Sequence, residues 1–245
     1  IGYLCQQIEQ IVRKFSSGND REPINIVVVG GGAGGVELSF TLDQRFGAMG
    51  LAADVKMIEK EQELLMNYSA SIRKRIYSQA KKRGISVICN SEVSRVMSDS
   101  VVLEDGSSLS FDLLIWVAGP WSQEIFKESG FSTDSRGFVL TRSTLQFEGY
   151  DNLFGVGDCA TLKEAPLTPK AGVYAVRQGP YLTHNLYKWL EGGSLKNYHP
   201  QGDFLTLLNL GNGSAVGGKW GWSFEGRWVM KLKDYIDRKF VADFS

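Results

Sequence analysis

The sequence lacks paired cysteines, an excess of charge of either sign, and a long apolar run. Its three cysteines, Cys5, Cys89 and Cys159, are far apart and form no CxxC or Cys/His cluster, so they indicate neither disulfides nor a zinc site. The 27 Lys and Arg residues are scattered and balanced by 27 Asp and Glu residues, which leaves no net field to attract nucleic acid. We therefore expect a protein of a reducing compartment that binds no nucleic acid.

No stretch of the chain approaches the roughly 18 uncharged apolar residues that a membrane-spanning helix needs. The first residues show no basic segment followed by an apolar one, so no targeting signal is apparent from Ile1 onward. With 43% hydrophobic residues, the 245-residue chain is too apolar to be disordered. These features predict a soluble or peripheral membrane protein and leave the compartment open between the cytoplasm and an organelle.

Hydrophobic periodicity predicts an α/β fold. Residues 1–23 are expected to form a helix, over 3–15, and a polar linker at 16–20. A β-branched run at 24–29 then opens an alternation of strands and helices that is typical of a parallel sheet. The further elements expected in this alternation are helix 35–46, strand 55–58, helix 69–83 and strand 85–89.

The pattern changes in the following segment. Short strands at 93–97, 101–103 and 107–109 are joined by polar turns, one of them the hairpin-favouring pair Asp105-Gly106, and predict an antiparallel meander. A buried strand at 111–117 ends at a Gly-Pro pair and closes a first domain over 24–119.

The rest of the chain predicts two smaller pieces. Residues 120–191 contain an expected strand at 153–158 and a long helix at 172–190. Residues 192–245 contain expected paired strands at 204–210 and 214–222 and a helix at 228–241, which together make a small α+β domain.

A glycine-rich turn follows the first β-branched strand. Gly30, Gly32 and Gly35 satisfy the GxGxxG pattern between an expected strand and an expected helix. In such a turn the first glycine permits a tight bend, the second lets the backbone approach a pyrophosphate, and the third lets helix and strand pack closely. The helix N-terminus then offers N–H groups to the anion. A merely flexible glycine loop is the alternative interpretation.

Glu59 favours the dinucleotide interpretation. It follows the second expected strand, 24 residues after Gly35, near the spacing of the acid that accepts the ribose hydroxyls. A carboxylate there repels a 2′-phosphate, so NADH is favoured over NADPH, although Lys60 and the basic run 73–75 lie near in sequence. A solvated glutamate at a strand end remains the alternative.

Three motifs in order resemble the pyridine nucleotide-disulfide oxidoreductase family, in its type II NADH dehydrogenase-like branch. GGGAGGVE at 30–37 resembles the NAD-binding loop, IWVAG at 115–119 the domain-closing strand, and LFGVGDCA at 153–160 the second FAD motif. The resemblance implies a Rossmann-like NAD-binding domain with its β-meander, inserted in a partial FAD-binding domain, and a small α+β domain at 192–245. Its expected cofactor-binding residues are Gly30, Gly32, Ala33, Gly34, Gly35, Glu37, Glu59, Ala118, Gly119, Gly157 and Asp158.

The resemblance also assigns roles to two acids. Asp158 would accept hydrogen bonds from the ribityl chain of FAD, and the N-terminus of the following helix would lie near the flavin pyrimidine. An N-cap is the compatible structural alternative for Asp158. Glu37 would lie close to the nicotinamide and flavin, whereas a glutamate in the first helical turn also simply complements the helix dipole.

The sequence departs from the family pattern at its start and at the acceptor site. The family begins with a strand, a glycine motif and a helix that bind the ADP part of FAD, and nothing before Ile24 supplies them, so we expect an N-terminal truncation. Of the glutamine-rich stretch near the quinone, only Gln178 is present. The stretch PKAGVYAVRQG at 169–179 is more similar to the NADH dehydrogenase-like domains fused to selenide, water dikinase.

The last expected helix is amphipathic. Trp228, Leu232, Ile236 and Phe240 share one face, opposite Lys and Asp residues. Type II enzymes dock on membranes through such helices, so the resemblance suggests a membrane surface as one partner. Packing on its own strands or on a second copy of the chain is the alternative.

The resemblance implies a flavoprotein that transfers a hydride from NADH to FAD and passes the electrons to a quinone or another acceptor. The cofactors perform this chemistry, so no catalytic side chain is required. Two alternatives stay open: a non-catalytic NADH-binding module, and a reductase for a ferredoxin or thioredoxin-type carrier. Bound flavin would distinguish the enzyme from the module.

Overall fold

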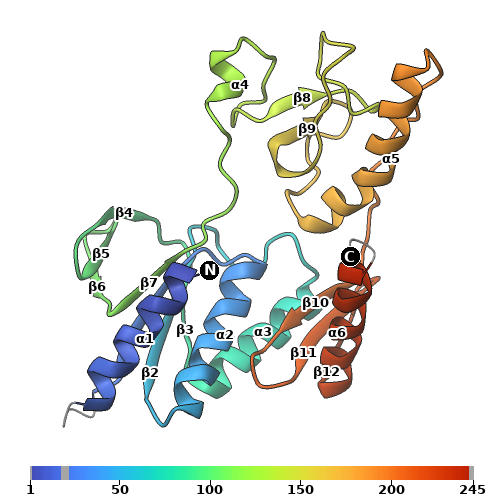
Figure 1. Ribbon diagram of the computed structural model, residues 1–245. Helices are drawn as coiled ribbons and strands as arrows, with labels where there is room; N and C mark the ends of the chain where they lie inside the picture. Colours follow the sequence, from blue (N-terminus) through green and yellow to red (C-terminus); the bar gives the residue numbers. More distant parts are fainter. Residues whose placement is uncertain (1, 18–21, 243–245) are drawn as a thin grey trace. The chain divides into compact units, whose positions relative to one another are not determined.

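The computed structural model describes residues 2–17 and 22–242, and its elements are shown in Figure 1. The chain divides into two compact units, which are described separately. The first comprises the described residues of 1–119 and 205–245, and the second comprises 120–204. The expected boundary at 191/192 therefore falls at 204/205. The expected linker at 16–20 lies largely outside the described residues.

A four-stranded parallel sheet is the centre of the first unit. Its order is β3 (Ser86–Ile88), β2 (Ala53–Ile58), β1 (Ile24–Val29) and β7 (Leu113–Trp116). The helices α2 (Ala33–Ala48) and α3 (Ala70–Arg83) connect the first three strands. The predicted β-α-β-α-β alternation is confirmed, and because parallel strands share a carboxyl end, the loops after β1, β2 and β7 meet at one edge.

The two faces of this sheet are buried by different elements. Ile26 and Val28 of β1 lie in a cluster with buried residues of α2, α3 and the N-terminal helix α1 (Gly2–Ser17). The alternate residues Val27 and Val29 pack on a second cluster with β5, as the period of a strand requires. The covering sheet is the expected meander: β4 (Val93–Val96), β5 (Ser100–Leu103) and β6 (Ser108–Ser110), with Gly106 at φ +84° in its hairpin turn.

The C-terminal segment packs onto the same helices. An antiparallel sheet of β10 (Thr206–Asn209), β11 (Ala215–Lys219) and β12 (Trp222–Gly226) precedes α6 (Arg227–Ala242). Leu208, Leu210 and Val216 belong to the core that α2 and α3 share with the parallel sheet, which explains why residues 205–245 group with the first unit. The expectation of one strand over 214–222 was wrong, because Trp220 and Gly221 reverse the chain with φ of +52° and +78°.

The second unit contains a short parallel pair and one long helix. Its elements are α4 (Ile125–Glu128), β8 (Val139–Thr141), the 3-10 turn Gly157–Cys159, β9 (Ala160–Leu162) and α5 (Gly172–Leu190). The expected strand at 153–158 was wrong: Phe154 forms only an isolated bridge with Gln146. Gly157 then turns the chain at φ +72° before β9 begins.

None of the described helices is both long and apolar enough to cross a membrane.

Candidate functional site

The glycine turn after β1 is shaped by two close approaches of the backbone. Gly30 has φ +116°, and a Cβ there would lie 2.3 Å from the carbonyl oxygen of Val117. A Cβ at Gly35 would lie 1.8 Å from the carbonyl oxygen of Gly30. Both positions therefore require glycine for the fold itself, the first for the tight bend and the third for helix–strand packing, as the motif predicts.

Gly32 and Gly34 differ from these two because they face open space. A Cβ at either position would meet nothing within 4 Å. Gly32 is the N-cap of α2, and no side chain caps the helix there. The first N–H groups of a helix have no partner within the helix, so the start of α2 at Ala33 offers donors and positive potential to an anion that approaches this surface.

Glu59 lies beside this turn, directly after β2. Its Oε2 accepts a hydrogen bond of 2.5 Å from the N–H of Gly31, and its Oε1 accepts one of 3.0 Å from the N–H of Glu61. The carbonyl oxygen of Gly31 accepts a bond of 2.9 Å from the N–H of Leu65. Gly31, which the sequence did not single out, thus joins the glycine turn to the loop after β2.

Ala118 and Gly119 follow β7 at the same edge of the sheet. Both are exposed, and Gly119 has φ +101°. The adjoining Val117 donates its N–H to the carbonyl oxygen of Val29 at 2.8 Å. The first unit therefore brings eight predicted residues together at the carboxyl ends of β1, β2 and β7: Gly30, Gly32, Ala33, Gly34, Gly35, Glu59, Ala118 and Gly119.

Glu37 is engaged by the C-terminal segment. Its Oε1 accepts a 2.7 Å hydrogen bond from the N–H of Asn209 in β10 and lies 3.8 Å from Nζ of Lys233 in α6. Because α2 begins at Ala33, Glu37 is in the second turn, so the alternative of a first-turn dipole contact was wrong. Its predicted role near the cofactors stays a prediction.

The second unit holds a pocket between the Gly157 turn, β9 and the start of α5. The predicted residues Gly157 and Asp158 line it, together with Ala160, Thr161, Leu162, Ala165, Thr168, Pro169, Lys170, Ala171, Tyr174, Ala175 and Gln178. Gln178 is only 6% exposed, and its Oε1 accepts a 2.6 Å hydrogen bond from the N–H of Gly157. This bond fixes the turn that presents the exposed Asp158.

The N-cap alternative for Asp158 was wrong. Val156 is the N-cap of the 3-10 turn that contains Asp158, and Ala171 is the N-cap of α5. Asp158 lies inside the 3-10 turn and therefore caps neither this turn nor α5.

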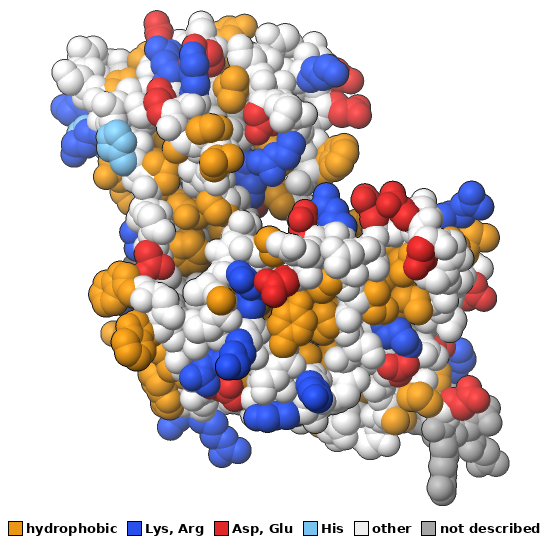
Figure 2. Space-filling model, turned by 180° about the vertical axis from the view of Figure 1, so that it is seen from behind, with side chains coloured by type: hydrophobic (Ala, Val, Ile, Leu, Met, Phe, Trp, Pro, Cys, Tyr) orange, Lys and Arg blue, Asp and Glu red, His pale blue; other side chains and the backbone are white. Residues whose placement is uncertain are grey.

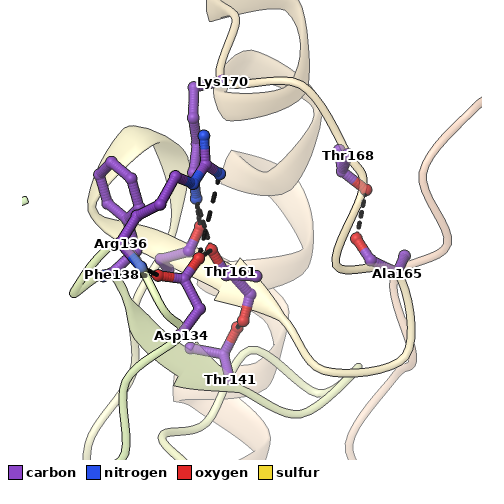
Figure 3. Close-up of polar contacts among 9 residues, drawn as sticks. Asp134, Arg136, Phe138, Thr141, Thr161, Ala165, Thr168 and Lys170 are labelled. Carbon is purple, nitrogen blue, oxygen red and sulfur yellow. Dashed lines mark hydrogen bonds and ion pairs between the residues drawn. The ribbon is translucent and has the colours of Figure 1, made fainter. Parts of the chain in front are cut away.

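A chain of hydrogen bonds crosses one side of this pocket (Figure 3). Lys170 donates from Nζ to Oγ1 of Thr161 at 2.9 Å and also to the carbonyl oxygen of Ala160. Thr161 donates its hydroxyl to Oδ2 of Asp134 at 2.8 Å. The other carboxylate oxygen of Asp134 accepts the N–H groups of Arg136 and Phe138 at 2.8 and 3.1 Å.

Burial and hydrogen bonding shift the pKa values of the two charged groups, Lys170 and Asp134. Burial lowers the pKa of Lys170, and the nearby Asp134 carboxylate offsets part of that effect. Burial alone would raise the pKa of Asp134, but the Thr161 hydroxyl and the two N–H donors outweigh it and lower that pKa.

The sequence analysis did not predict the hydrogen bonds that link Lys170, Thr161 and Asp134. One signal was available: Lys170 stands directly before the N-cap of α5, where a cation opposes the helix dipole.

The apolar face predicted for the last helix is partly exposed. Val229 is the buried residue of α6, whereas Trp228 is 56% exposed and Trp222, on the adjoining strand, is 80% exposed. On the face of the molecule in Figure 2, acidic and basic side chains are interspersed with hydrophobic ones.

A parallel sheet, a glycine turn, an uncapped helix N-terminus and an acid after the second strand make up the arrangement of dinucleotide-binding α/β proteins. Residues 5–182 match the family model for pyridine nucleotide-disulphide oxidoreductases. The chain belongs to this family.

Individual relatives agree with this assignment. The chain is 30% identical over 195 residues to the demethylphylloquinone reductase NdbB of Synechocystis, covering 77% of this chain and 48% of that protein. It is 24% identical over 254 residues to a type II NADH:quinone oxidoreductase of Staphylococcus saprophyticus, covering 97% and 62%. The chain thus spans about half to three-fifths of these relatives.

A solved structure shares the fold. The sulfide:quinone oxidoreductase of Aquifex aeolicus superposes with a TM-score of 0.76 at 16% identity, covering 95% of this chain and 60% of that one. At this identity the likeness concerns the fold alone.

Proposed function

We propose that the chain binds NADH and FAD and transfers a hydride from NADH to the flavin, with the electrons passed on to a quinone or another acceptor. The observation that carries this proposal is the open space in front of Gly32 and Gly34 at the start of α2. This space lies at the same edge of the sheet as Glu59. Family membership supports it.

The residues of the first unit fit NADH. The N–H groups at the start of α2 would bind the pyrophosphate, which can approach because Gly32 and Gly34 carry no side chain. Glu59 is held beside the turn by Gly31, where it would accept the ribose hydroxyls and repel a 2′-phosphate. The proposal therefore favours NADH over NADPH.

The residues of the second unit fit part of FAD. Asp158 is exposed at the pocket and would accept ribityl hydroxyls, while Gln178 holds its turn in place. Ala171 caps α5 without a side-chain hydrogen bond, so the helix N-terminus is open to electron-rich ligand atoms. Bound FAD would supply the hydride-accepting ring, and the protein would orient it.

A quinone is the acceptor that the relatives favour, since two of their names state a quinone or phylloquinone. Gln178, however, is committed to the N–H of Gly157, which gives it a structural task that does not require a quinone. A carrier reductase therefore stays as the alternative for the acceptor, and a non-catalytic NADH-binding module as the alternative for the whole chain.

A visible absorption spectrum tests the proposal. The purified chain is mixed with FAD, freed of unbound flavin, and titrated with NADH without oxygen. We expect a flavin band that NADH bleaches and NADPH bleaches less readily. A chain that binds NADH but retains no flavin would contradict the proposal and favour the binding module.

The exposed apolar side chains of the C-terminal segment are proposed to contact a membrane surface or a second copy of the chain. Sedimentation with liposomes and the mass in solution distinguish these partners. Substitution of Trp222 and Trp228 by Ser should reduce vesicle binding in the first case and dimer formation in the second. A variant that changes neither would remove this surface from both roles.

A further inference from the structure

Lys170 carries a positive charge that is held inside the second-unit pocket without a direct carboxylate partner. Its ammonium contacts the Ala160 carbonyl, the Thr161 hydroxyl and the face of the Phe138 ring, whose centroid lies 4.4 Å away. Among the described residues, no ion pair to Lys170 lies within 4.0 Å. Lys170 is half-buried, and the carboxylates of Asp134 and Asp158, which lie beyond ion-pair distance, offset only part of the cost of burying its charge.

The hydrogen bonds around Thr161 fix the position of this charge. Thr161 has one hydroxyl proton and donates it to Asp134, so it must accept from Lys170 through a lone pair. Thr161 is 4% exposed. Asp134 is anchored in turn by two backbone N–H groups. Hydrogen bonds with this fixed direction, centred on the buried Thr161, hold the ammonium in one place.

The pocket places a second source of positive potential close to the first. Lys170 directly precedes Ala171, the N-cap of α5, and the N-terminus of this 19-residue helix carries the positive end of its dipole. Both elements line the same pocket as Asp158. Beside Lys170 and this helix end, ligand atoms that carry, or acquire, negative charge are favoured, whereas the Asp158 carboxylate suits ligand groups that donate hydrogen bonds.

We propose that Lys170, held by Thr161 and Asp134, stabilises the reduced flavin and thereby raises its reduction potential. This inference rests on the proposed function, in which the pocket holds the flavin. In the reaction, NADH gives a hydride to oxidised FAD, which forms NAD⁺ and the anionic reduced flavin. Lys170 keeps its proton throughout and acts through charge alone.

A purely structural role for Lys170 makes a different prediction. The side chain also joins the segment before α5 to β9, through Ala160 and Thr161. If this is all it does, removal of the charge should lower the stability of the second unit without changing the equilibrium between oxidised and reduced flavin.

The test compares this equilibrium in four proteins loaded with FAD: the wild-type chain, K170M, K170R and K163M. K170M keeps the apolar stem and loses the charge. K163M loses the same charge at an exposed site paired with Glu148, outside the pocket. The fraction of reduced flavin is read from the absorption band at potentials poised with a redox dye.

We expect the ratio of reduced to oxidised flavin in K170M to fall about tenfold, which equals about 30 mV for a two-electron couple. K170R should keep most of the wild-type ratio, and K163M all of it. Equal ratios in the wild type and K170M would overturn the proposed role of Lys170 but leave the proposed function of the protein standing. A wild-type chain that takes up no FAD would overturn this inference together with the proposed function.

T161V decides the question if K170M does not fold. It leaves the charge of Lys170 in place but removes its link to Asp134, so the ratio should shift in the direction expected for K170M. A T161V protein with the wild-type ratio would show that the fixed position of the charge has no effect.

Discussion

Glu59 and Gly31 are joined by a 2.5 Å hydrogen bond from the backbone N–H of the glycine to Oε2 of the glutamate. The bond connects the residue that would select the ribose to the turn that would bind the pyrophosphate. A Cβ at Gly31 would lie 2.5 Å from Cδ2 of Leu64 and 2.8 Å from Oε2 of Glu59, so there is no room for a side chain between them. The two parts of the proposed NADH site are therefore positioned by one contact.

Replacement of Glu59 by Arg should change the preference between the two dinucleotides. The wild-type carboxylate repels a 2′-phosphate, whereas a guanidinium attracts it. We expect the ratio of NADH to NADPH affinity, measured by fluorescence titration, to fall at least about tenfold, which corresponds to roughly 1.4 kcal/mol. The matched control is E61R at a neighbouring exposed acid. An unchanged ratio in E59R would show that Glu59 does not contact the ribose.

Alanine at Gly32 and at Gly35 should separate binding from folding. In G35A the new Cβ meets the Gly30 carbonyl oxygen at 1.8 Å, so we expect a loss of about 1–3 kcal/mol or more in stability. In G32A the Cβ meets no protein atom within 4 Å, so the melting temperature should hold while NADH affinity falls. If G32A binds NADH as tightly as the wild type, the pyrophosphate does not lie at this turn.

The carboxylate of Asp134 should stabilise the second unit in a pH-dependent way. Its pKa in the folded state is below the ordinary value of 3.8, so the stabilisation is present above that value and is lost as pH falls through the folded pKa. D134N should cost about 1–3 kcal/mol at neutral pH. The cost should shrink as the pH is lowered, as measured by urea unfolding.

D151N is the control for this prediction, because Asp151 is an exposed partner of Arg142. Exposed pairs contribute about 0–1 kcal/mol, so D151N should show a small effect. If D134N costs the same free energy of unfolding at neutral pH and at a pH below 3.8, the pKa of Asp134 is not lowered in the folded protein.

Gln178 should contribute to the stability of the second unit, whatever the electron acceptor is. Q178A leaves the N–H of Gly157 without its buried partner, which costs roughly 1–3 kcal/mol, and it should loosen the turn that carries Asp158. We expect lower thermal stability and weaker FAD retention. V176A, at an exposed position of the same helix, is the comparison. Full stability of Q178A combined with a selective loss of quinone reduction would instead assign Gln178 to the acceptor site.

The local features of this protein were determined by the sequence. The β-branched run before Gly30 specifies a strand buried on both faces, and Asp105-Gly106 specifies a hairpin, because both depend on backbone preferences of adjacent residues. The glycine spacing and the position of Glu59 predicted which loops would meet, because parallel strands bring their carboxyl ends to one edge.

Tertiary structure decided the contacts between distant segments. The partners of Glu37, 172 residues away in β10 and still further on in α6, follow from how the C-terminal sheet packs on α2. The turn at Trp220 adopts a conformation that a tryptophan rarely takes, so residue preference alone could not locate it.

The chain from Lys170 through Thr161 to Asp134 depends on tertiary structure in the same way. It forms because β8 and β9 pair and bring residues 134, 161 and 170 together. Sequence spacing encodes preferences of the backbone and of its near neighbours, whereas a side chain finds its distant partners only when the core has packed.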